Sequence, residues 1–313
     1  MKSLRSHQRL LIFMLLILAL TCVVSPWLAA GAYWFATQGS PWPMEPYSFS
    51  RIFNRTFMIS GILLFFICRR WLKINSFSQL GLVASLKESR DLFTGWILAF
   101  GSMVLLAAAM SFAGVFTPYF RLSLAQSLAE CASAFFSGAA VGFFEEIFFR
   151  GILFKGLLAE GRRVRAYVLA NLFYSALHFV KPGESYVLEQ FDPLAGFPHL
   201  FSTFAPFLDP VSILPGLFGL FFIGAVLSYA LERTGYLYLS IGLHAGWVFA
   251  LKTIRVFGNY KRQDLGWIFG STEPKIVTGV GTWLGILIVL IVVHQLTGKR
   301  RGLFGDSPSP RAV

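Results

Sequence analysis

Two adjacent glutamates and an arginine lie in a segment that is otherwise apolar, residues 141–151, which reads V-G-F-F-E-E-I-F-F-R-G. Acidic and basic residues cost about 2.5–3.5 kcal/mol each at the centre of a membrane helix, so those that occur there usually serve a function. Arg150 follows Glu146 by four residues, a spacing that places both side chains on one helical face. Glu145 is rotated from Glu146 by about 100° and points to a different neighbour. The pattern predicts that Glu146 pairs with Arg150 and that Glu145 is left available for chemistry.

Two histidines are expected at the same membrane depth as this acidic pair. Counted from the helix ends that we expect to be cytoplasmic, Glu145, His178 and His244 all lie roughly 14–20 Å deep, at about 1.5 Å per residue. The remaining histidines fall in the basic N-terminus, in a loop and near the end of the last helix; these are His7, His199 and His294. A carboxylate and a neutral imidazole that share a water molecule form a general-base pair, and a second imidazole can donate to a developing oxyanion. These residues favour water-mediated hydrolysis of a peptide bond within the membrane, and we expect no cofactor.

Other interpretations of the same residues stay open. Glu145, His178 and His244 include two imidazoles and one carboxylate, a ligand set that suits zinc. Taken alone, Glu146 and Arg150 could form a buried ion pair that fixes helix packing, and each histidine could be a packing residue. Neither G-x-S-x-G nor H-E-x-x-H occurs in the chain, so the serine hydrolase and zincin classes lack their motifs.

The composition is that of a membrane protein. Of the 313 residues, 56% are hydrophobic and only 13% are charged, whereas soluble domains carry about 25% charged residues. Apolar segments occur at residues 10–36, 52–68, 92–116, 126–158, 166–180, 211–231, 236–250 and 277–296. We therefore predict an all-α fold, a polytopic membrane helical bundle of about eight transmembrane helices. The first segment could also be a signal peptide, but its apolar character continues through Tyr33, Trp34 and Phe35, so we expect it to be retained.

The positive charges follow membrane topology rather than a nucleic-acid surface. The net charge is +12, and basic residues cluster at the N-terminus and at residues 69–90, 155–165, 232–233 and 299–301. The positive-inside rule makes these loops cytoplasmic, so we expect a multi-pass protein of a bacterial inner (plasma) membrane with both termini cytoplasmic. One basic group would lie outside: Lys252, Arg255, Lys261, Arg262 and Lys275. Either the rule is overruled there or the preceding helix does not cross fully.

We expect four regions along the chain. Residues 1–125 hold N-terminal transmembrane helices, 126–252 a catalytic core, 253–298 a loop with the last transmembrane helix, and 299–313 a disordered basic tail. Within the core, residues 181–210 are expected to be a long loop at the membrane interface because they are rich in Phe and Pro. The expected partners are the lipid bilayer and a membrane-anchored protein or peptide substrate, with no nucleic acid.

At these residues the chain resembles the CAAX protease and bacteriocin-processing family of glutamic intramembrane endopeptidases, over about residues 126–252. The first family motif, E-E-x-x-x-R, is met by Glu145, Glu146 and Arg150. The second, F-x-x-x-H, ends at His178 but begins with Tyr174 instead of Phe. The third, H-x-x-x-N, begins at His244 but ends with Val248 instead of Asn.

The resemblance implies a role for each matched residue. Glu145 would activate a water molecule together with His178, Arg150 would hold Glu146, and His244 would help to build an oxyanion hole. Val248 removes the expected second donor, and loss of one such donor typically costs about 10²–10³ in rate. The indole of Trp247 or the amide of Asn171 could replace it.

Two rival functions remain beside the endopeptidase. The first is a non-catalytic relative that binds a membrane partner as a scaffold or immunity protein, which Val248 favours. The second is a transporter or channel that uses the buried charges as a relay. The second ranks last, because the sequence shows neither inverted repeats nor paired broken helices.

Overall fold

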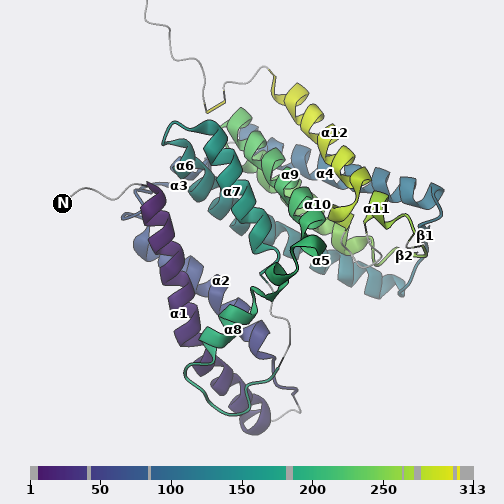
Figure 1. The fold of residues 1–313 in the computed structure, drawn as a ribbon. Coiled ribbons are helices and arrows are strands. Elements are labelled where there is room, and N and C mark those ends of the chain that lie inside the picture. Colours follow the sequence, from purple (N-terminus) through teal and green to yellow (C-terminus); the bar gives the residue numbers. More distant parts are fainter. Residues whose placement is uncertain are drawn as a thin grey trace, which may run out of the picture. The chain divides into compact units, whose positions relative to one another are not determined.

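The computed structural model describes residues 6–40, 44–83, 86–180, 186–262, 264–270, 276–298 and 302–303. The chain forms two compact units, each described here by itself (Figure 1). The first contains Met1–Asn75 and Ala176–Ile213, and the second contains Ser76–Ser175 and Leu214–Val313. The tail predicted at residues 299–313 lies outside the described residues apart from 302–303.

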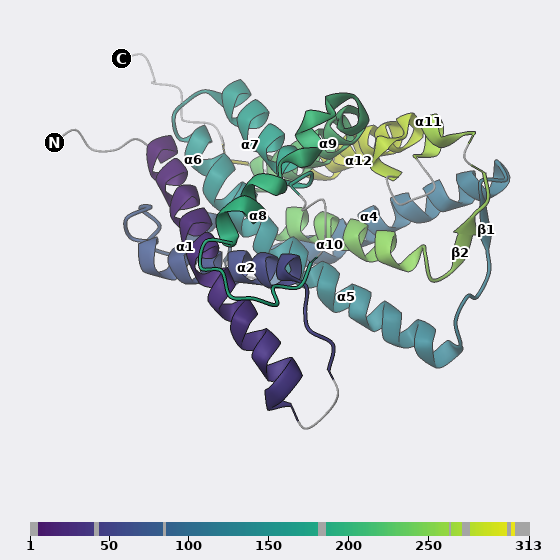
Figure 2. The same cartoon turned by 60° about the horizontal axis from the view of Figure 1, so that its bottom comes forward.

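The first unit is built on two long helices and a short one, which lie together in both views (Figures 1 and 2). Its elements are α1 (Ser6–Trp34), the π-helical turn η1 (Phe35–Gly39), α2 (Phe49–Cys68), α8 (Gly196–Ser202) and the 3-10 turn η3 (Ala205–Leu208). α8 packs closely on α1, because a Cβ atom added at Gly196 would lie 2.1 Å from the carbonyl oxygen of Cys22. The expectation that residues 181–210 form only a loop was therefore wrong, since tertiary packing on α1 stabilises a helix there.

The second unit contains most of the helices and a short two-stranded ribbon. Its elements are α3 (Phe77–Leu80), α4 (Leu86–Phe112), β1 (Phe116–Pro118), α5 (Leu124–Glu146), the π-helix η2 (Ile147–Phe154), α6 (Lys155–Leu158), α7 (Arg163–Leu177), α9 (Pro210–Thr234), α10 (Tyr238–Thr253), β2 (Gly258–Tyr260), α11 (Gly266–Phe269), the 3-10 turn η4 (Ile276–Thr278) and α12 (Val280–Thr297). The last two residues of α7 and the first four of α9 belong to the first unit.

Helix α10 lies at the centre of the second unit, between α4 and α5 (Figure 2). Ten of its 16 residues are buried. Cβ atoms added at Gly242 and Gly246 would lie 2.1 Å from the Leu92 carbonyl oxygen and 2.6 Å from the Trp96 carbonyl oxygen of α4. On the other side, a Cβ atom at Gly142 of α5 would lie 3.0 Å from the α10 backbone. Glycines thus let three helix backbones touch, as small residues do in membrane helix interfaces.

A short β-ribbon fixes the far end of α10. β1 and β2 pair antiparallel, with Phe116 opposite Tyr260, and the Leu237 N–H donates to the Gly81 carbonyl at the near end. The chain from 237 to 260 therefore runs along α4 from one end to the other. Of the basic residues that follow α10, Lys275 lies outside the described residues.

The all-α class and the multi-pass membrane character are confirmed. Each of the eight predicted segments contains a helix, and among the described residues six helices are long and apolar enough to cross a membrane. These are His7–Gly39, Phe49–Cys68, Glu88–Phe112, Leu124–Leu158, Pro210–Thr234 and Val280–Thr297. The other two, α7 and α10, have 15 and 16 residues, fewer than the roughly 20 that a spanning helix needs.

Candidate active site

The ion pair expected from the four-residue spacing is present and fully buried. Arg150 Nη1 lies 3.0 Å from Glu146 Oε1, and the two side chains are 1% and 0% exposed. Arg150 Nη2 also donates to the carbonyl of Gly224 on α9 at 3.2 Å, and its guanidinium lies 4.3 Å from the centre of the Tyr174 ring. The arginine is thus held by an acid, a backbone carbonyl and an aromatic face, so the buried pair is compensated within the protein.

The pair lies where α5 changes into a π-helix. The α-helical hydrogen bonds end at Glu146, and η2 continues from Ile147 to Phe154. Segments of π-helix are rare and occur frequently at functional sites. The sequence predicted a long apolar segment over 126–158 but not the π-helix, because hydrophobic periodicity does not distinguish a short π-helical segment from an α-helix.

His244 lies between the two glutamates. Its Nδ1 is 2.8 Å from Glu146 Oε1, and its Nε2 is 3.8 Å from Glu145 Oε2. A carboxylate paired with arginine only accepts hydrogen bonds, so the Nδ1–H donates to Glu146. This bond fixes the ring and aims Nε2 at Glu145.

Glu145 differs from its neighbour in exposure and in partners. Its side chain is 34% exposed, whereas Glu146 is fully buried. Its Oε2 atom is buried and accepts no hydrogen bond from the described residues. Glu145 is therefore the carboxylate of the cluster that can take up a proton without breaking an ion pair.

The structure brings together four of the five predicted site residues, namely Glu145, Glu146, Arg150 and His244. His178 directly follows α7 and belongs to the first unit, so its place beside Glu145 stays a prediction. Within the described ranges, no three His, Cys, Asp or Glu side chains form a group that could hold a metal ion.

The two groups suggested as replacements for the missing donor are engaged elsewhere. The Trp247 indole N–H donates to Ser102 Oγ of α4 at 3.2 Å. The Asn171 amide donates to the Tyr167 carbonyl at 2.9 Å and accepts from Ser228 Oγ at 3.0 Å. Both serve helix packing, so the suggestion that either faces the site is not supported.

Several supporting residues were missed from the sequence. Gly224 is needed because a Cβ atom there would lie 2.8 Å from Asn171 Oδ1 and 3.3 Å from Arg150 Nη2. Gly242 and Gly246 set the position of His244 between them. The G-x-x-x-G spacing of these last two glycines is a signal that could have identified α10 as a close-packing helix.

Taken together, the fold and the cluster define an integral membrane protein with carboxylate, imidazole and guanidinium groups in its apolar interior. Residues 126–250 match the family model described as type II CAAX prenyl endopeptidase Rce1-like. A search of curated proteins and a search of solved structures gave no match. The family match includes all five predicted site residues and confirms the resemblance for this segment. It supports a hydrolase of the CAAX protease type.

Proposed function

We propose that the protein is a glutamic intramembrane endopeptidase, which hydrolyses a peptide bond of a membrane-associated protein or peptide, lipidated ones included. The observation that carries this proposal is the contrast between Glu146, neutralised by Arg150, and Glu145, which has no such partner and faces His244. Residues 126–252 are the proposed catalytic core.

In this mechanism Glu145 acts as the general base. Its carboxylate takes a proton from a water molecule while the water oxygen forms a bond to the carbonyl carbon. The resulting oxyanion collapses, the C–N bond breaks, and the proton passes from Glu145 to the leaving nitrogen. His178 is proposed to hold the same water molecule, as the resemblance implies.

His244 is proposed to stabilise the oxyanion. Its Nδ1 proton is committed to Glu146, so donation to substrate needs a second proton on Nε2 and an imidazolium ring. The charges of the cluster then cancel, because the imidazolium and Arg150 balance Glu145 and Glu146. A neutral cluster is far less costly in an apolar interior than one with an unbalanced charge.

We also propose that both termini are cytoplasmic and that the membrane is a bacterial inner membrane. The basic residues that follow the α5 span, Arg162, Arg163 and Arg165, support this orientation. The basic residues from Lys252 onward count against this orientation. The proposal therefore depends on the greater number of basic groups at the other ends of the helices.

The first test is cleavage by the purified protein in detergent, with membrane-anchored and lipidated peptides as substrates. Glu145→Gln should lower the rate by about 10²–10⁴-fold, the usual contribution of a general base. Glu130→Gln, which changes an exposed glutamate of the same helix, should not. Chelator should have no effect on the wild type; loss of activity in chelator would instead favour the zinc alternative.

A scaffold without activity is the second candidate, and Val248 favours it. It predicts that the folded wild type cleaves nothing under conditions in which an active relative does. Val248→Asn then distinguishes a peptidase that lacks one donor from a scaffold without activity. Restoring a donor one helical turn after His244 should raise the rate by about 10²–10³-fold if only that donor is missing, and should change nothing in a true scaffold.

A further inference from the structure

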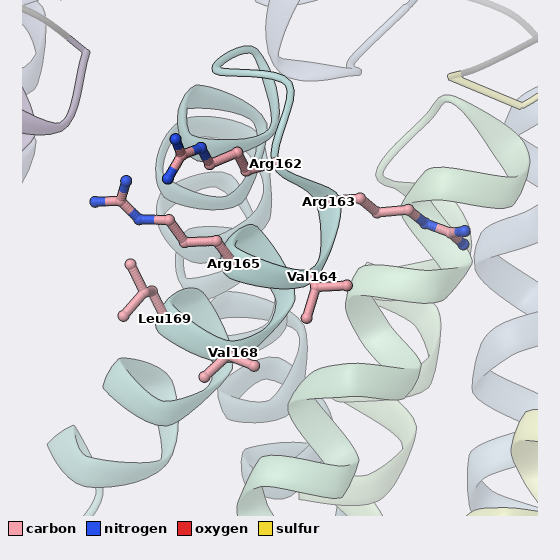
Figure 3. Close-up of a pocket in the computed structure, with 6 residues that line it drawn as sticks. All are labelled: Arg162, Arg163, Val164, Arg165, Val168 and Leu169. Carbon is pink, nitrogen blue, oxygen red and sulfur yellow. The ribbon is translucent and has the colours of Figure 1, made fainter.

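A basic depression lies outside the candidate active site, at the start of α7. It has a volume of about 710 Å³ (Figure 3). Its lining combines three guanidinium groups with three aliphatic side chains: Arg162, Arg163, Val164, Arg165, Val168 and Leu169. The proposed function uses none of these side chains, so the depression calls for an explanation of its own.

The three arginines are not equivalent. The guanidinium of Arg163 contacts the buried carboxylate of Glu232 on α9 at 2.7 and 3.0 Å, and Tyr167 donates to the same carboxylate. Figure 3 shows Arg163 extending toward the neighbouring helix, away from Arg162 and Arg165. Its charge is therefore already compensated.

Arg162 and Arg165 are exposed and extend to the same side of α7 (Figure 3). Among the described residues, neither side chain forms an ion pair or a hydrogen bond. Two guanidinium groups on one side of a helix present a set of donors that suits a phosphate, which arginine binds in a bidentate way.

The aliphatic residues and the position of the depression indicate which phosphate it fits. Val164, Val168 and Leu169 are exposed beside the arginines. The candidate span Leu124–Leu158 ends four residues before Arg162, so the depression lies where a membrane helix leaves the bilayer. A soluble anion would leave these aliphatic side chains in water, whereas a phospholipid covers them with its acyl chains.

We propose that this depression binds an anionic phospholipid, with the headgroup phosphate on Arg162 and Arg165 and the acyl chains along Val164, Val168 and Leu169. Basic pockets at helix ends are known to recognise anionic headgroups in other membrane proteins. The inference does not depend on the proposed peptidase chemistry.

The test is native mass spectrometry of the full chain in neutral detergent, titrated with phosphatidylglycerol or phosphatidylcholine. The wild type should retain phosphatidylglycerol more tightly, and Arg162→Gln/Arg165→Gln should weaken that binding by about tenfold or more, as expected for two charge-assisted contacts. The control Arg255→Gln/Lys261→Gln removes the same charge on the two sides of β2 and should leave binding unchanged. All three proteins should have equal thermal stability.

Three results would overturn the proposal. Equal weakening by both double variants would mean that only net charge matters. Equal retention of the two lipids by the wild type would mean that no headgroup is recognised. Competition by inorganic phosphate, combined with no effect of Val168→Ser/Leu169→Ser, would assign the arginines to a free phosphate instead of a lipid.

Discussion

Two histidines, one in each unit, are almost completely buried but lie in opposite surroundings. His244 is 4% exposed and lies between Glu146 and Glu145. His199 is 2% exposed, and its ring centre lies 4.9, 4.9 and 5.8 Å from those of Phe49, Phe53 and Tyr186. Neither ring nitrogen of His199 has a hydrogen-bond partner among the described residues.

The difference shows that neighbours, not residue type or burial, decide what a buried histidine can do. His244 has a carboxylate on each side, and its Nδ1–H donates to one of them, Glu146. The apolar surroundings of His199 disfavour its charged form and lower its pKa. We therefore expect His199 to serve packing, whereas His244 is the histidine proposed for chemistry, and the following predictions test that contrast.

The largest effect is expected from breaking the polar surroundings of His244. Arg150→Met leaves the buried Glu146 carboxylate without its cation and should lower the free energy of unfolding by about 3–5 kcal/mol. The matched control is Arg262→Gln, which breaks an ion pair with Asp264 in which both side chains are more than half exposed. Exposed pairs contribute about 0–1 kcal/mol. Denaturant titration in detergent measures both.

If the two arginine variants lost a similar free energy of unfolding, this account of the buried pair would be contradicted. The double variant Glu146→Gln/Arg150→Met adds a check on its cause. It removes the uncompensated charge and should recover part of the stability lost in Arg150→Met.

A smaller effect is expected when the backbone that carries His244 is displaced. An alanine at Gly242 would bring its Cβ atom to 2.1 Å from a backbone oxygen of α4, so the helices must separate, at about 1–3 kcal/mol of stability. Gly101, in the middle of α4, has no atom within 4 Å of its Cβ position. Gly101→Ala should stabilise the protein by about 0.5–1 kcal/mol. A lower melting temperature for Gly242→Ala and a higher one for Gly101→Ala would support the close packing. A change in the same direction for both variants would refute it.

The contrast between the two histidines also shows which features of the fold and the site could be predicted from the sequence. The Glu146–Arg150 pair was predictable because a four-residue spacing brings side chains together within one helix, whatever the rest of the fold does. A helix in each of the eight apolar segments was predictable because such a segment is a local signal, but among the described residues only six of these helices are long and apolar enough to span. The meeting of His244 with Glu145 followed from a common depth in the membrane, which needs only approximate helix ends.

The features that were missed depend on contacts between distant segments. The burial of His199 requires α8 to pack on α2, where Phe49 and Phe53 lie, and local composition suggested only a loop there. The β-ribbon pairs residues 116–118 with 258–260, more than a hundred residues apart. Asn171 and Trp247 were suggested as replacements for the missing donor, but Ser228 and Ser102 on neighbouring helices hold their side chains instead.

The smallest effect, and the one specific to the first unit, concerns pH. Burial holds the pKa of His199 below its ordinary value of 6.5. Just below pH 6.5 the unfolded chain therefore binds a proton that the folded chain does not, so this residue makes stability fall as pH falls through that range. His199→Phe keeps an aromatic ring among the three aromatic neighbours and removes the titrating group. Its melting temperature should decrease less than that of the wild type between pH 7.5 and pH 5.5. Because the carboxylates and other histidines are common to both proteins, their contributions cancel in the difference, and parallel pH profiles would mean that His199 is accommodated in its charged form.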